Sequence, residues 1–130
     1  MILLETSALI EVWRTNGRAD AKARVESALR SGKAALCQPV VLEMRAGLKR
    51  PQEFQMLQDF IDVVAMLPVT DEVWRLAGER ARAFRKQGLT VSNFDTLIFA
   101  VAEHHDADIV TIDRHFGLMR DALKKVKSDQ

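Results

Sequence analysis

Ile2-Leu3-Leu4-Glu5-Thr6-Ser7, near the start of the chain, joins a short apolar run to a carboxylate and two hydroxyl groups. A short apolar run that ends at polar side chains is typical of a strand buried on both faces. The same pattern recurs along the chain. It predicts buried strands at residues 2–4, 34–37, 66–69 and 109–112, with a fifth candidate at 125–127.

Longer segments with helical periodicity lie between these strands. Apolar side chains recur at steps of three and four within residues 54–64, 73–84 and 94–102, which places each set on one helix face. Strands that alternate with helices favour a parallel sheet, because parallel neighbours need crossover connections. We therefore expect one α/β domain over residues 1–130, with three layers (α/β/α) and a parallel sheet of four or five strands.

The composition is that of an ordinary globular domain, with 48% hydrophobic and 28% charged residues. The 19 Lys and Arg nearly cancel the 18 Asp and Glu, so a polyanion has to be bound by local clusters of charge. The single Cys37 lies in an apolar run, which predicts a buried strand thiol. No apolar run reaches the roughly 18 residues that cross a membrane, and we expect a cytoplasmic protein.

Four acidic residues are expected to meet at one edge of this sheet. Glu5 and Asp113 directly follow predicted strands, while Glu43 and Asp95 lie in the first turns of predicted helices. In an open parallel sheet the chemistry lies at the carboxyl ends of the strands, where the following helices also begin. The four carboxylates therefore converge on one rim, although they come from distant parts of the chain.

Each of these acids also has a structural interpretation. Ser92 and Asp95 are spaced as in a capping box. Asp113 can cap the next helix, and Glu5 can be a solvated charge at a strand end. Glu43 is harder to explain in this way, because its neighbours are apolar and a buried carboxylate is costly without a cation or hydrogen bonds. Converging carboxylates favour a divalent cation, and an all-oxygen donor set favours Mg²⁺ or Mn²⁺ over Zn²⁺.

The acids belong to four short motifs that follow one another in a fixed order. These motifs are Ile2-Leu3-Leu4-Glu5-Thr6-Ser7-Ala8-Leu9-Ile10, Val41-Leu42-Glu43 followed by Gly47, Asp95-Thr96-Leu97-Ile98 with Ala100 and Ala102, and Val110-Thr111-Ile112-Asp113 with Phe116. Together they resemble a PIN domain, and within that family the chain is most similar to the VapC toxins of bacterial toxin–antitoxin pairs. The resemblance implies a metal-dependent endoribonuclease that holds Mg²⁺ or Mn²⁺ and is inhibited by a cognate antitoxin, which threads a peptide across the site.

The resemblance also implies roles for individual residues. The metal ligands and catalytic acids are Glu5, Glu43, Asp95 and Asp113, and the supporting hydrogen-bond donors are Thr6, Ser7 and Thr111. Glu5 departs from the pattern, because the family usually has Asp there. The longer side chain moves the carboxylate, and a misplacement of about 1 Å can cost about a hundredfold in rate. We therefore expect weakened activity, in a natural variant with a shifted ion, in a natural weakly active member or through an inactivating change.

An RNA substrate needs positive charge near the site. Arg14, Arg82 and Arg85 are the candidate phosphate contacts, although charged helix faces are often only solvated. We expect a homodimer, because the apolar face of residues 54–64 exceeds what a small sheet needs. The cognate antitoxin is the second protein partner, DNA is reached only through it, and no membrane contact is expected.

Two other classes remain open. A catalytically inactive PIN-like interaction module keeps the fold, and Glu5 favours it. A phosphoacceptor receiver domain has a similar length and an acidic carboxyl edge, with Asp71 and Lys127 available. It normally has paired acids after the first strand, where Glu5 stands alone.

Overall fold

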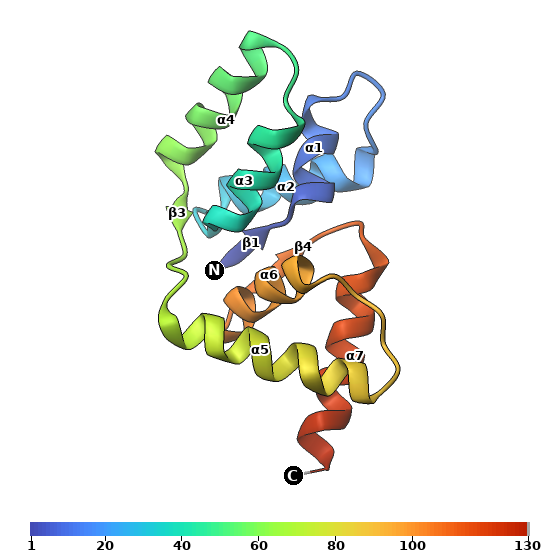
Figure 1. Cartoon of the computed structure of the whole chain (residues 1–130). Coiled ribbons are helices and arrows are strands. Elements are labelled where there is room, and N and C mark those ends of the chain that lie inside the picture. The colour runs from blue at the N-terminus through green and yellow to red at the C-terminus, as the bar shows by residue number, and fades with distance from the viewer. Residues whose placement is uncertain (130) are drawn as a thin grey trace.

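The computed structural model describes residues 1–129, in which helices surround a small central sheet (Figure 1). In chain order the elements are β1 (Ile2–Leu4), α1 (Thr6–Trp13), α2 (Ala19–Arg30), β2 (Ala34–Leu36), α3 (Gln38–Gly47), α4 (Pro51–Val63), β3 (Ala65–Met66), α5 (Asp71–Lys86), α6 (Asn93–His104), β4 (Asp108–Val110) and α7 (Arg114–Ser128).

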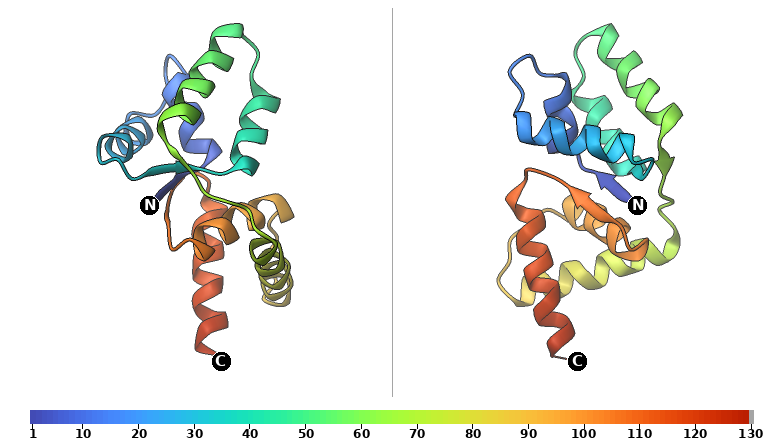
Figure 2. Two further views of the ribbon diagram at one scale, coloured as in Figure 1. Left: turned by 90° about the vertical axis from the view of Figure 1, so that its left-hand side faces the viewer. Right: turned by 180° about the vertical axis from the view of Figure 1, so that it is seen from behind.

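The strands form one parallel sheet in the order β3-β2-β1-β4. In its register, Leu3 of β1 lies between Ala35 of β2 and Ile109 of β4. Helices α1 to α4 lie on one side of the sheet and α5 to α7 on the other, as Figure 2 shows from two directions. The predicted three-layer α/β architecture is therefore confirmed, with four strands in residues 1–129.

The fifth strand predicted at residues 125–127 was wrong. These residues lie in α7, which continues to Ser128. Phe116, Met119 and Ala122 are buried at steps of three along this helix, so its apolar side packs against the core. Three residues carry too little periodicity to distinguish a strand from the last turns of an amphipathic helix.

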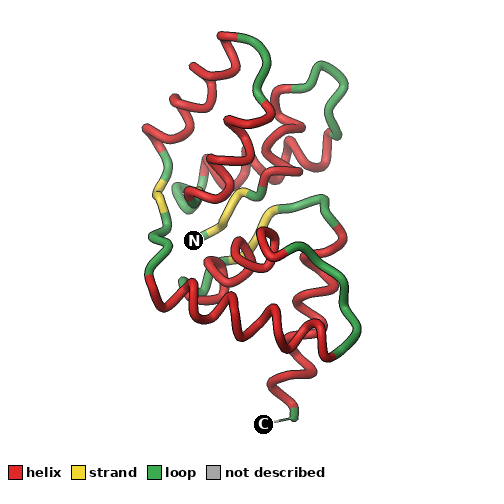
Figure 3. Tube along the Cα trace, in the orientation of Figure 1, coloured by secondary structure: helices red, strands yellow, loops and turns green. Residues whose placement is uncertain are grey.

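β1 has the predicted bounds, whereas β2, β3 and β4 are shorter than the apolar runs that predicted them (Figure 3). β3 ends at Met66, and Pro68 just beyond it cannot donate to a ladder. β4 ends at Val110, because the next backbone N–H groups turn to side-chain oxygens. An apolar run indicates that residues are buried. It does not indicate where the backbone N–H groups stop bonding the neighbouring strand and bond side-chain oxygens instead.

Cys37 is fully buried and forms the N-cap of α3, one residue beyond β2. Burial raises the pKa of its thiol to about 11, so the reactive thiolate is scarce at neutral pH. The predicted burial of this thiol is confirmed, although the residue stands at the start of a helix rather than in the strand.

Helices begin where strands end. α1 starts directly after β1, and α3 starts directly after β2, with Pro39 in its first turn. The fixed φ of proline suits that position, where its missing N–H has no intrahelical partner to lose. α7 starts four residues after β4. The side chains between each strand and its helix are thereby brought to the carboxyl edge of the sheet.

None of the helices in residues 1–129 is long and apolar enough to span a membrane.

Candidate metal centre

Glu5 lies between β1 and α1, with its side chain enclosed at the carboxyl edge. Only 3% of the residue is exposed. Its Oε1 accepts hydrogen bonds from Ser7 Oγ at 2.5 Å and from Thr111 Oγ1 at 2.6 Å. Glu5 is therefore neither solvated nor free to swing, and the interpretation as a solvated strand-end charge was wrong.

The two hydroxyl groups that hold Glu5 also shape the loop after β4. Ser7 Oγ accepts the backbone N–H of Ile112, and Thr111 Oγ1 accepts that of Asp113, each at 3.0 Å. Each hydroxyl thus donates to the carboxylate and accepts from the main chain. The network fixes the path of the chain into α7, and Asp113 is the residue directly before this helix.

Asp95 and Asp113 lie at the starts of α6 and α7. Ser92 caps α6 by accepting the backbone N–H of Asp95 at 3.0 Å, and Asp113 caps α7 by accepting that of His115 at 2.9 Å. The capping interpretation therefore holds for Ser92 and Asp113. Capping also aims both carboxylates toward one point, because both helix starts lie at the same edge.

Ligand atoms of Asp95, Asp113 and His115 all lie within 4.8 Å of one another. His115 is not among the site residues predicted from the sequence, yet its Nδ1 lies 2.9 Å from Asp113 Oδ1. The available signal was its position two residues after a helix cap, where the first turn can carry a side chain back toward the cap.

Burial and mutual repulsion govern the charge of this cluster. Burial, more than any other factor, raises the pKa of the Glu5 carboxyl, while the hydrogen bonds from Ser7 and Thr111 oppose it and the charge of Asp113 adds to it. Burial also raises the pKa of Asp95, and Asp113 again adds to the rise. These acids are thus close enough to disfavour one another's ionised forms.

Glu43 lies apart from this group, on α3. Its Oε1 accepts a hydrogen bond from Thr6 Oγ1 at 2.7 Å, and the carboxylate is half-buried. This hydrogen bond offsets part of the cost of placing the Glu43 carboxylate among apolar neighbours. Both residues line a cleft of about 410 Å³ that also includes Arg14.

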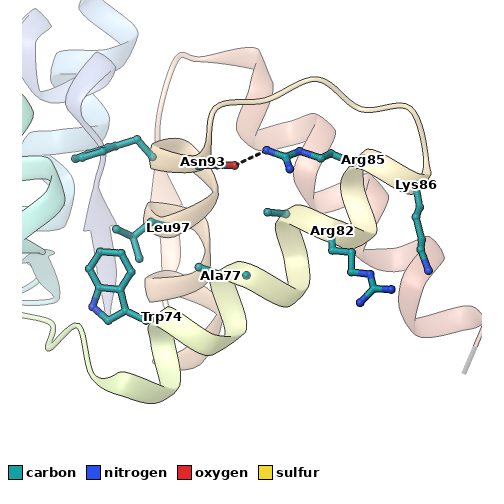
Figure 4. Close-up of a pocket in the computed structure, with 10 residues that line it drawn as sticks. Trp74, Ala77, Arg82, Arg85, Lys86, Asn93 and Leu97 are labelled. Carbon is teal, nitrogen blue, oxygen red and sulfur yellow. Dashed lines mark hydrogen bonds between the residues drawn. The ribbon is translucent and has the colours of Figure 1, made fainter.

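The three candidate RNA contacts lie in two clefts. Arg14 pairs with the buried Glu11 at 3.2 Å. Arg82 and Arg85 line a larger cleft of about 900 Å³ between α5 and α6. In Figure 4 Arg85 reaches across it to Asn93 Oδ1, at 3.1 Å, while Arg82 points away from α6. Asn93 is the first residue of α6, so the cleft reaches the end of this helix at which Asp95 also lies.

The residues present fit a divalent cation. Carboxylates that raise one another's pKa are stabilised in their ionised form by a bound cation. The carboxylate oxygens of the group suit Mg²⁺ or Mn²⁺, and the group includes no thiolate, the ligand that selects softer metals. The candidate ligands are Asp95, Asp113 and His115, with Glu5 beside them and Glu43 further along the edge.

Comparison with known proteins identifies the class. The family model of the PIN domain matches residues 2–121. The chain belongs to the PIN domain family, which confirms the resemblance drawn from the four motifs and replaces the receiver-domain alternative.

Relatives within the family narrow the assignment to the VapC type. Ribonuclease VapC11 of Mycobacterium tuberculosis is 32% identical over 122 residues, which cover 92% of this chain and 91% of that protein. Ribonuclease VapC19 of the same species is 29% identical over 123 residues, or 93% and 96% of the two chains.

Solved structures show the same fold. VapBC2 from Rickettsia felis, bound to a promoter DNA fragment, contains a chain that is 21% identical with a TM-score of 0.73, covering 88% of this chain and 89% of that one. FitAcB from Neisseria gonorrhoeae is 20% identical with a TM-score of 0.72, covering 93% and 94%.

The buried Glu5 predicts a stability that depends on pH in the metal-free protein. Because its folded pKa lies above the usual 4.5, its favourable contribution is present below that pH and is lost as pH rises through the folded value. We expect Glu5→Gln to raise Tm by a few degrees at pH 7, with a gain that shrinks toward pH 4.

Melting curves recorded with a chelator across this range provide the measurement, with the exposed Asp121→Asn as the control. A Glu5→Gln protein that melts at or below the wild-type temperature at pH 7 contradicts the assignment of Glu5 as an unfavourably buried carboxylate.

Proposed function

We propose that this protein is the toxin of a toxin–antitoxin pair and hydrolyses RNA with the help of Mg²⁺ or Mn²⁺. The observation that carries the proposal is the meeting of Asp95 and Asp113 at the carboxyl edge, with Glu5 held beside them. The relatives named VapC ribonucleases support the reaction class. Because the proposed substrate is cellular RNA, we also propose that the protein acts in the cytoplasm.

A divalent ion supplies a nucleophilic water and neutralises charge on the phosphate. Asp95 and Asp113 would hold this ion, with Glu5 and Glu43 directly or through water. In the hydrolysis, a water oxygen bonds to phosphorus, the bond to the 3′ oxygen breaks and that oxygen receives a proton. Asp95 and Glu43 are the candidates to transfer the proton. The product then carries a 5′-phosphate, whereas attack by the ribose hydroxyl leaves a cyclic phosphate.

The hydroxyl groups of Ser7 and Thr111 have a positioning role in this proposal. They hold Glu5 Oε1 and fix the loop that carries Asp113. Thr6 does the same for Glu43. The side chains around the ion are thereby oriented before substrate binds, which reduces the reorganisation that the reaction requires.

One observation favours the alternative of a catalytically inactive PIN-like interaction module. The family usually has Asp where this chain has Glu5, and Glu5 Oε1 is occupied by two hydroxyl groups. A carboxylate held in this way is a poor ligand. This module would keep the fold and its protein partners without cleaving RNA.

Cleavage of a total RNA pool separates the two candidates. We expect Mn²⁺-dependent cleavage with 5′-phosphate ends, which Asp95→Asn abolishes because one charged ligand is lost. We expect Glu5→Asp to raise the rate, by up to about a hundredfold, as it moves the carboxylate to the family position. A Glu5→Asp protein without metal-dependent cleavage contradicts the ribonuclease proposal, as do cyclic phosphate ends.

Arg82 and Arg85 are proposed to contact RNA phosphates along the cleft between α5 and α6. For single strands each lost phosphate contact reduces the slope of log affinity against log salt by about 0.7, so reversing both charges should reduce it by about 1.4. The control reverses the charges of Arg30 and Lys33. These residues precede β2 and lie at its amino end, away from the carboxyl edge of the sheet. Equal slopes for the two double variants contradict the contact.

Two protein partners complete the proposal, a cognate antitoxin and a second copy of this chain. Large apolar side chains are exposed in two regions, with Val63 at 76% and Phe54 at 49% on α4, and Trp74 at 58% and Leu42 at 57% near α6.

We expect the isolated chain to have twice its monomer mass by light scattering. We also expect its cognate antitoxin to co-purify with it when the two proteins are co-expressed. A monomeric mass contradicts the homodimer. DNA contact would come through the antitoxin, in keeping with VapBC2 bound to promoter DNA.

A further inference from the structure

His115 lies in the acidic group, but the proposed function gives it no role of its own. It is the second residue of α7, and its Nδ1 lies 2.9 Å from Asp113 Oδ1. The side chain is 36% exposed and that of Asp113 is 28% exposed, so both face the open side of the group. An imidazole that served only to cover the core would not share its ring nitrogen with this carboxylate.

Glu5 is less available than His115 to bind an ion, because hydroxyl groups already occupy its carboxylate. Glu5 Oε1 is occupied by Ser7 and Thr111, and Glu5 has no ligand atom within the 4.8 Å group. Of the His, Cys, Asp and Glu residues in positions 1–129, the group unites Asp95, Asp113 and His115. The third potential ligand beside the two aspartates is therefore a ring nitrogen rather than the carboxylate of Glu5.

The distance between His115 Nδ1 and Asp113 Oδ1 also fits shared ligation. Two donors at right angles around an ion, with bonds of about 2.1 Å, lie about 3 Å apart. The observed 2.9 Å therefore suits an ion bound by both atoms as well as it suits a hydrogen bond. To bind one ion with both atoms, the imidazole has to turn so that its Nδ1 lone pair points at the ion and no longer at Asp113 Oδ1.

We propose that His115 is a direct ligand of the divalent ion, so that the centre has two carboxylates and one imidazole. The inference rests on the metal centre of the proposed function and deepens it. Mg²⁺ prefers oxygen donors, whereas imidazole favours transition metals, and Mn²⁺ accepts both kinds. The centre consequently selects Mn²⁺ over Mg²⁺, and the selectivity depends on His115 rather than on the acids.

Pulsed electron paramagnetic resonance of the Mn²⁺-loaded protein tests this directly. A coordinated ring nitrogen adds a ¹⁴N coupling to the spectrum, and we expect it in the wild type and its loss in His115→Asn. The asparagine variant keeps a polar side chain that can still hydrogen-bond Asp113. His105→Asn is the control, because His105 lies at the other end of α6 and contacts Pro68 O at 2.8 Å.

Titration calorimetry on the same proteins measures selectivity. We expect His115→Asn to weaken Mn²⁺ binding at least tenfold and Mg²⁺ binding much less, with an unchanged Tm in chelator. Wild-type protein that binds Mn²⁺ without a ¹⁴N coupling overturns ligation by His115 and leaves the proposed ribonuclease intact. Wild-type protein that binds no Mn²⁺ overturns both.

Discussion

The carboxylate of Glu5 is buried at the end of the first strand, and the chain around it is arranged to hold it there. Ser7 and Thr111 donate to the same oxygen, and their own oxygens accept the N–H groups of the loop that leads into α7. The start of α1 and the entry to α7 are thereby joined through one side chain. That junction directs the backbone of Asp113, while the N–H of His115 holds its carboxylate at the start of α7.

The site and the fold make opposite demands on the same residues. Burial and the charge of Asp113 raise the pKa of Glu5 and of Asp95, so the folded chain holds acids where neutral side chains would be more stable. Helix starts reduce this cost, since Asp95 and Asp113 lie where backbone N–H groups and the helix dipole favour negative charge. Capping and ligation are therefore compatible uses of one carboxylate.

Topology explains what could be predicted from the sequence. Apolar runs predicted the four strands, and the rule that parallel strands end at one edge predicted that Asp95 and Asp113 lie together. Other features depend on side-chain rotamers and local backbone partners, which hydropathy does not encode. Examples are the early end of β4, the turn of Glu5 toward two hydroxyl groups, the separation of Glu43 with Thr6, and the return of His115 toward its own cap.

The bond between Thr111 and Glu5 spans 106 positions of sequence. A chain emerging from the ribosome has made its first strand and its first acid long before the last strand that completes the centre is available. A fragment that ends before Thr111 lacks the loop that orients Asp113 and therefore lacks the assembled acidic group. Because the group needs residues from both ends of the sequence, it assembles only when the chain is almost fully synthesised.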